Sequence, residues 1–174
     1  MAQLTQHFAD TELGVDAPQL RSLLPADQAR IVSNATQLCI RILEPTRAHY
    51  NLPVDMHCGY RPPAHNAKVG GKPNSFHLYN GDEAAGDWGI PTIPYADIFD
   101  WVRLKSGLPF DEVIIETIEE LPILATAQAY LDWVRSTATA ACIHTQIHAQ
   151  QPNRRIALIG QTGAGRLYIP VPVN

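Results

Sequence analysis

The stretch CGYRPPAHNAKVGGKPNSFHLYNGDEAAGD, from Cys58 to Asp87, is the part of the chain around which the predicted fold is arranged. It holds an Arg, a glycine-rich turn, a Ser two residues before a His, and a closing Ala-Gly-Asp. His77 and Asp87 are residue types that bind divalent metals such as zinc. The small residues Ala85 and Gly86 before Asp87 suit a backbone that passes close to a metal. The stretch therefore predicts a metal site.

On the N-terminal side, the sequence predicts a helix that is interrupted by a proline. Pro25 begins it, because proline is favoured in the first turn of a helix, and apolar residues then recur at helical spacing. These residues are Ile31, Ala35, Leu38 and Ile42. Pro45 predicts a kink or a break into a second short helix ending near Tyr50. Phe8 and Leu13 are expected to anchor the preceding segment on the core.

The rest of the chain predicts a mixture of strands and helices. Strands are expected at 54–60, 110–116, 142–148, 156–159 and 167–173, and helices at 93–106 and 119–141. Because side chains alternate along a strand, Cys142, His144, Gln146 and His148 should share one face. The glycine run at 160–165 lacks the Lys-Ser/Thr of a phosphate loop and predicts a hairpin turn instead.

Composition limits the classes of protein that the chain can belong to. Its 174 residues suit one domain, and 45% hydrophobic with 17% charged residues is ordinary for a globular protein. A net charge of −4 argues against binding nucleic acid through phosphate contacts. No apolar run approaches the roughly 20 residues that span a bilayer, and the N-terminus lacks the pattern of a secretory signal. Cys39, Cys58 and Cys142 predict buried free thiols and a reducing cytoplasm.

The motifs of the quoted stretch resemble those of the M15-type zinc peptidases. These include D-alanyl-D-alanine carboxypeptidases, the vancomycin-resistance dipeptidase and phage endolysins. Ser75-Phe76-His77 and Ala85-Gly86-Asp87 match the two ends of their Ser-x-His…Ala-x-Asp pattern. The family usually places six residues between His and Asp, whereas this chain has nine. The surplus lies around residues 80–83, a turn-prone run that a surface loop can accommodate.

The resemblance covers roughly residues 4–160 and implies a fold. That fold is a single α+β domain over residues 1–174, with helices packed on a small, mostly antiparallel sheet. Residues 1–24 would form an N-terminal segment and residues 160–174 a C-terminal strand or tail.

The resemblance also implies a Zn²⁺ site with His77, Asp87 and His144 as ligands. The third ligand of the family is a His on a late strand, followed about eight residues later by Asn-Arg-Arg. His144 and then Asn153-Arg154-Arg155 match that register. His148, which shares the predicted strand face, is expected to bind substrate or to support a ligand.

Further residues of the site are implied by the same family patterns. Arg61, in a Gly-Tyr-Arg motif, would hold a substrate carboxylate or polarise a carbonyl, and Ser75 would contact substrate. Glu116 ends a segment similar to the endolysin pattern Phe-Asp-Gln-Leu-Ile-x-Glu. Several relatives place the general base three residues before the last His, where this chain has Ala141. The base is therefore Glu116 or an acid of residues 80–83, or the site is inactive.

The function that the resemblance implies is hydrolysis of the peptide stems of bacterial peptidoglycan. The chain would be a monomeric phage endolysin or virion-associated lysin, made in the host cytoplasm without a signal peptide. It would act at the bacterial cell wall or in the virion, without nucleic acid and without membrane insertion. One alternative is an inactive phage structural or wall-binding domain on the same fold. A third is a soluble enzyme acting on small D-amino-acid dipeptides.

Overall fold

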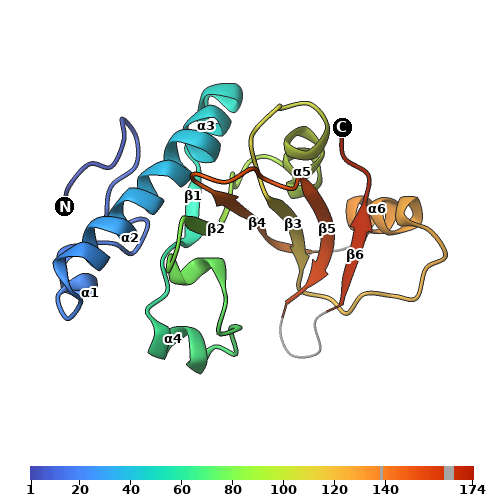
Figure 1. The fold of residues 1–174 in the computed structure, drawn as a ribbon. Helices are drawn as coiled ribbons and strands as arrows, with labels where there is room; N and C mark the ends of the chain where they lie inside the picture. The colour runs from blue at the N-terminus through green and yellow to red at the C-terminus, as the bar shows by residue number, and fades with distance from the viewer. Residues whose placement is uncertain (138, 163–166) are drawn as a thin grey trace.

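A six-stranded sheet forms the centre of the computed structural model, which describes residues 1–137, 139–162 and 167–174. The strands are β1 (Asp55–Cys58), β2 (Glu83–Gly89), β3 (Glu112–Thr117), β4 (Ala140–His148), β5 (Ile156–Gln161) and β6 (Tyr168–Val171). Their order is β1-β2-β4-β3-β5-β6 (Figure 1). β3 and β5 are parallel, and every other neighbouring pair is antiparallel. The predicted α+β class with a mostly antiparallel sheet is therefore confirmed.

Several helices pack against this sheet. The helices are α1 (Ala17–Leu20), α2 (Pro25–Leu38), the π-helix η1 (Cys39–Leu43), α3 (Glu44–Tyr50), α4 (Pro63–Lys68), the 3₁₀-helix η2 (Phe76–Leu78), α5 (Tyr95–Leu104) and α6 (Ala127–Ser136). α2 packs on β2, α5 on β3 and β4, and α6 on β6. Figure 1 shows α2 and α3 near β1 and α6 beside β6, at opposite edges of the sheet. Within the described part of the chain, none of these helices has the length and apolarity to cross a membrane.

The two sheet faces differ in chemistry because side chains alternate along each strand. One face carries apolar residues into the core, including Trp88, Val113, Ile115, Ile143 and Ile159. The same core takes in Phe8 and Leu13 of the N-terminal segment, as predicted, and Val171 of the last strand. The opposite face carries the polar residues of β2, β3 and β4. That face is where the candidate site lies.

The chain does not break at Pro45: α2 passes directly into η1 and η1 into α3, which ends at Tyr50 as predicted. Pro45 has no N–H, and its ring would clash with the carbonyl four residues earlier in a regular helix. The widened π-turn at Cys39–Leu43 precedes it, and α3 then runs to Tyr50. Asn51 ends α3 in the left-handed conformation, with φ of 53°.

The long helix predicted over 119–141 is wrong in its extent. Only Ala127–Ser136 is helical, and β4 already begins at Ala140. Pro122 lacks the N–H that a helix interior needs, so the segment before residue 126 runs as a loop. The Thr126 hydroxyl then accepts from the Ala129 backbone N–H and caps the shorter helix.

The remaining predictions for the fold hold with shifted boundaries. The helix expected at 93–106 is α5, and Gly107 follows it with φ of +66°. The last two strands pair antiparallel as β5 and β6, but residues 163–165 of the predicted turn lie outside the described residues. Cys39, Cys58 and Cys142 are free thiols, of which Cys58 is half-buried.

Gly59 follows β1 at a point where the N-terminal segment passes very close. A Cβ on Gly59 would lie 2.5 Å from the Leu13 carbonyl oxygen, which accepts a 2.8 Å hydrogen bond from the Tyr60 N–H. We expect Gly59→Ala to lower the free energy of unfolding, measured by urea denaturation, by roughly 1–3 kcal/mol, because the backbone at Leu13 or Gly59 must move to make room for the methyl group. In the control Gly70→Ala, the added Cβ meets nothing within 4 Å, and only the φ of +72° is unfavourable. That change should cost about 1 kcal/mol; equal losses would contradict the packing argument.

Asp111 is fully buried and joins β3 to the loop before β5. Its carboxylate accepts from the Arg154 backbone N–H at 2.9 Å and from the guanidinium Nη2 at 2.6 Å. Burial alone would raise the pKa of Asp111, but these hydrogen bonds lower it below its ordinary value. The carboxylate therefore contributes stability that is present above its unfolded pKa of about 4 and lost as pH falls through the lower folded pKa.

We expect Asp111→Asn to lower the free energy of unfolding at pH 7 by about 2 kcal/mol, since charge-assisted hydrogen bonds are lost. The variant should also lose less stability than the parent between about pH 4 and pH 2. Urea denaturation at several pH values measures both effects. Parallel pH profiles for the two proteins would show that Asp111 titrates alike in the folded and unfolded states.

Candidate metal centre

The loop between α4 and η2 brings His77 to the polar face of the sheet. Asn66 of α4 is buried, and its Nδ2 donates a 2.9 Å hydrogen bond to the Lys72 carbonyl. Gly71 lies so close that a Cβ there would collide with the Asn66 side chain. The Ser75 hydroxyl accepts from the His77 N–H at 3.4 Å and caps η2. The Asn, Gly and Ser of this segment therefore set the position of His77.

The two ring nitrogens of His77 have different surroundings. Nδ1 donates a 2.7 Å hydrogen bond to the Gly59 carbonyl, which leaves the lone pair on Nε2. Nε2 is buried and has no hydrogen-bond partner in the described part of the chain, although Asp87 Oδ1 lies 3.4 Å away. Burial lowers the pKa of His77 and favours the neutral ring. A neutral imidazole with a free, buried Nε2 beside a carboxylate fits a metal ligand.

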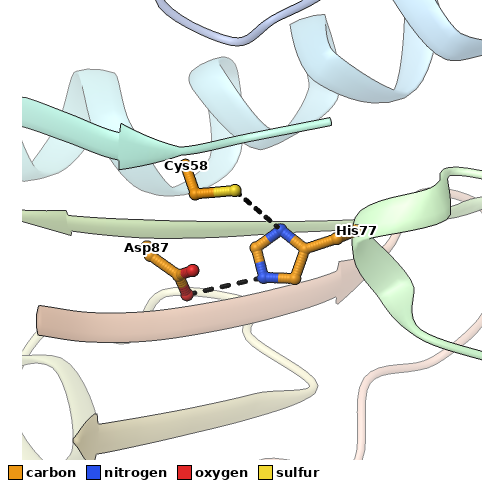
Figure 2. A group of neighbouring side chains, drawn as sticks. All are labelled: Cys58, His77 and Asp87. Carbon is orange, nitrogen blue, oxygen red and sulfur yellow. Dashed lines mark hydrogen bonds and ion pairs between the residues drawn. The ribbon is translucent and has the colours of Figure 1, made fainter. Parts of the chain in front are cut away.

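Asp87 faces Nε2 of His77 (Figure 2) and also contacts His144 and Arg61. It pairs with His144 in the β2–β4 register, and its Oδ1 is 2.7 Å from His144 Nδ1. Its Oδ2 accepts from Arg61 Nη2 at 3.3 Å. Burial would raise the pKa of Asp87, but the contacts with His144 and His77 hold it well below its ordinary value. Conversely, burial would lower the pKa of His144, but the hydrogen bond to Asp87 raises it.

Gly86, the residue before Asp87, has a packing role on the other face of the sheet. A Cβ on Gly86 would lie 3.0 Å from Leu38 Cδ2 of α2 and 3.1 Å from Met56 Cε. Gly86 therefore faces the helix side of the sheet, and its size permits α2 to pack on β2. This packing gives Gly86 a reason to be glycine that does not depend on a metal.

A second combination of ligands includes a cysteine. Cys58, His77 and Asp87 offer atoms that all lie within 4.8 Å of one another. Figure 2 shows that Cys58 faces Nδ1 of His77, at 4.0 Å, whereas Asp87 faces Nε2. Since Nδ1 already donates to Gly59, Cys58 and the free lone pair lie on opposite sides of the ring. Burial also raises the pKa of the Cys58 thiol and disfavours the thiolate that zinc binds. This group of three residues does not contain His144, the predicted third ligand, although His144 Nδ1 lies 2.7 Å from Asp87 Oδ1.

The nine-residue connection between His77 and Asp87 is held by hydrogen bonds that lie outside this cluster. Asp82 accepts from the backbone N–H groups of Gln150 and Gln151 at 3.2 and 3.1 Å, and its Oδ1 is 3.1 Å from His148 Nδ1. Glu83 accepts from the Gly81 N–H at 2.9 Å. Asp82, Glu83 and His148 form a second group of metal-binding residue types. These hydrogen bonds already engage both carboxylates, so the group fastens the connection to the end of β4.

A pocket of about 420 Å³ opens over the cluster. Six of the sequence-predicted residues line it: Arg61, Ser75, His77, Asp87, Glu116 and His144. His148 and the acids of residues 80–83 are not among its lining residues. The prediction that His148 binds substrate therefore gains no support from its position.

Three charged residues of the pocket were missed from the sequence: Lys72, Glu112 and Arg154. For Glu112 a signal was present, because Glu112 and Glu116 lie four residues apart on one strand. Side chains at that separation share a face of the sheet.

The position that holds the general base in relatives lies in a strand irregularity. Glu116 pairs with Cys142 and Thr117 with Ala140, so Ala141 is the extra residue of a β-bulge. Glu116 thus lies opposite Cys142, the residue that follows Ala141, and its Oε2 is 3.9 Å from the Cys142 sulfur. Its charge contributes to the raised pKa of His144. A carboxyl group is therefore present beside the cluster although residue 141 is alanine.

Comparison with known proteins gives one match. A family model described as Peptidase M15 matches residues 2–108. The match contains Arg61, Ser75, His77 and Asp87, whereas β3 and β4, with Glu116 and His144, lie beyond it. No curated protein and no solved structure matches the chain.

Proposed function

Because this chain belongs to the peptidase M15 family, we propose that it is a zinc-dependent peptidase that hydrolyses the peptide stems of bacterial peptidoglycan. The observation that carries the proposal is the buried, unpartnered Nε2 of His77, which faces the same carboxylate that contacts His144. Without a cation between them, two hydrogen-bond acceptors, His77 Nε2 and the Asp87 carboxylate, face each other in a buried site, which is unfavourable. A bound divalent cation would remove this cost.

The residues that would hold zinc are His77 through Nε2, Asp87 through Oδ1 and His144 through Nδ1. Two histidines and a carboxylate are a ligand set of catalytic zinc sites, which keep one position open. A zinc ion held there supplies Lewis acidity toward the carbonyl of a scissile peptide bond. The Gly59 carbonyl and Arg61 keep the His77 ring and the Asp87 carboxylate in orientation.

We assign the proton transfers of hydrolysis to Glu116. A peptidase needs a group that accepts a proton from the attacking water and passes one to the leaving amine. Glu116 lines the pocket and lies close enough to His144 to influence its pKa. The acids of residues 80–83, the other candidates from the sequence, are engaged outside the pocket. Arg61 and Ser75 line the same pocket and would contact the substrate backbone.

A role as a phage endolysin or virion-associated lysin follows from the proposed substrate. The chain would act as a monomer at the bacterial cell wall or in the virion. The continuous core from Phe8 to Val171 supports a single domain over residues 1–174.

Release of muropeptides from purified peptidoglycan tests the proposal. We expect release with added zinc, none with a chelator, and recovery when zinc is restored. Walls with different cross-link types should be tried, together with free D-amino-acid dipeptides. Cleavage of the dipeptides alone would indicate the soluble dipeptidase instead. Stoichiometric zinc with no cleavage of any substrate would contradict the enzyme and favour a wall-binding domain.

A further inference from the structure

Glu112 places a second carboxyl group in the pocket that the proposed reaction does not use. It lies on the same face of β3 as Glu116 and pairs with Gln146 of β4. Gln146 Oε1 in turn is 3.5 Å from His144 Nε2. Glu112 lies two positions before Ile114, the partner of His144, a distance of about 7 Å along the strand. The distance from Glu112 to the metal cluster thus corresponds to about two residues of an extended substrate peptide.

The charged groups that face Glu112 are largely engaged elsewhere. They are His144, Arg154, Asp111 and Lys72. Arg154 directs Nε and Nη2 to Asp111, and His144 contacts Asp87. Lys72 is exposed, and among the described residues neither it nor any other cation lies within 4.0 Å of the Glu112 carboxylate. Burial raises the pKa of Glu112, as expected for a half-buried carboxylate without a close partner.

A carboxylate in this position is unfavourable until a cation or a hydrogen-bond donor reaches it. The pocket itself is open to a ligand. A primary ammonium complements a carboxylate, because it carries the opposite charge and has three hydrogen-bond donors, whereas the carboxylate only accepts. The stem peptides of the proposed substrate contain diamino acids, which can present such an ammonium.

We propose that Glu112 is a specificity-determining residue that binds a primary ammonium of the substrate and so selects stem peptides with a free side-chain amine. This inference rests on the proposed peptidase function for the identity of the substrate. Lys72, at the rim of the same pocket, opposes the ammonium and would be displaced toward solvent by it.

Two synthetic stem peptides test the proposal, one with lysine as its diamino acid and one with Nε-acetyllysine, both with a blocked N-terminus. Their dissociation constants are measured by calorimetry on the full chain in chelator, so that no hydrolysis interferes. We expect the parent to bind the free amine about 10-fold more tightly than the acetylated peptide. Glu112→Gln should reduce this ratio to about 1, whereas Glu112→Asp should keep a preference for the free amine.

Lys72→Ala is the matched control, because it removes a positive charge from the same pocket. It should preserve or increase the preference for the free-amine peptide over the acetylated one. Equal binding of both peptides by the parent, or a ratio that survives Glu112→Gln, would overturn the proposal. With zinc present, Glu112→Gln should raise KM for the free-amine peptide with kcat little changed. An equal loss of kcat for both peptides would assign Glu112 to proton transfer instead. If zinc supports no hydrolysis, the peptidase proposal fails, while the calorimetric ratio still decides the role of Glu112.

Discussion

Replacing His144 by alanine is expected to remove zinc binding and peptide hydrolysis together, whereas Cys58→Ser should preserve both. His144 Nδ1 contacts the same Asp87 oxygen that faces the free Nε2 of His77. Cys58 lies on the other side of the His77 ring and accepts from Arg61 Nε at 3.3 Å, a role that a serine hydroxyl can fill. A four-ligand zinc site is worth roughly 10–16 kcal/mol, so one ligand represents about 3 kcal/mol or more. That corresponds to a loss of at least about 100-fold in zinc affinity.

The measurement is the zinc content of each variant after dialysis against a competing chelator, with muropeptide release from the same samples. Thermal unfolding of the metal-free proteins shows whether the His144→Ala variant is folded. If Cys58→Ser loses the metal and His144→Ala keeps it, the ligand set is Cys58, His77 and Asp87. If both variants keep stoichiometric zinc, the metal lies elsewhere in the protein.

This choice of ligand shows where the sequence was informative. Alternation over residues 142–148 correctly placed His144 on the face of Gln146, because a half-buried strand imposes a period of two. It could not show that Asp87 is the residue opposite His144, since register is set by pairing of strands far apart in the sequence. The resemblance supplied that link, although the matched family region ends before β4 begins.

Some of the errors come from contacts that a linear sequence does not display, and others from local signals that helical periodicity outweighed or that were not used. The extent of α6 depended on Pro122 and on the cap at Thr126, which helical periodicity alone does not register. Gly86 is small because of Leu38, which lies in a helix nearly fifty residues earlier. Asp82 and Glu83, candidates for the base from the sequence, are engaged by the backbone after β4 and by the Gly81 N–H, contacts that the sequence does not display. Glu112 was missed because only the last acid of its strand was considered.

Replacing Glu116 by glutamine is expected to lower kcat by about 10²–10⁴-fold, the usual contribution of a positioned general acid–base group. The amide keeps the size of the side chain and part of its hydrogen bonding, but it cannot accept a proton at neutral pH. Glu116 is not one of the proposed ligands, so zinc content should be unchanged. KM should change little, because the proton is transferred only in the transition state.

Glu120→Gln is the matched control for this substitution. Glu120 is an exposed acid of the loop that follows β3, and it is not among the lining residues of the pocket. The control should retain the full rate of muropeptide release. A Glu116→Gln protein that keeps both its zinc and its kcat would show that Glu116 is not the base. Because Ala141 carries no ionisable group and the other acids near the cluster are Asp87 and Glu112, that result would return the proton transfer to Glu112. Loss of kcat with zinc retained would instead show that a carboxyl group on β3 performs the role that relatives place on the strand of the last histidine.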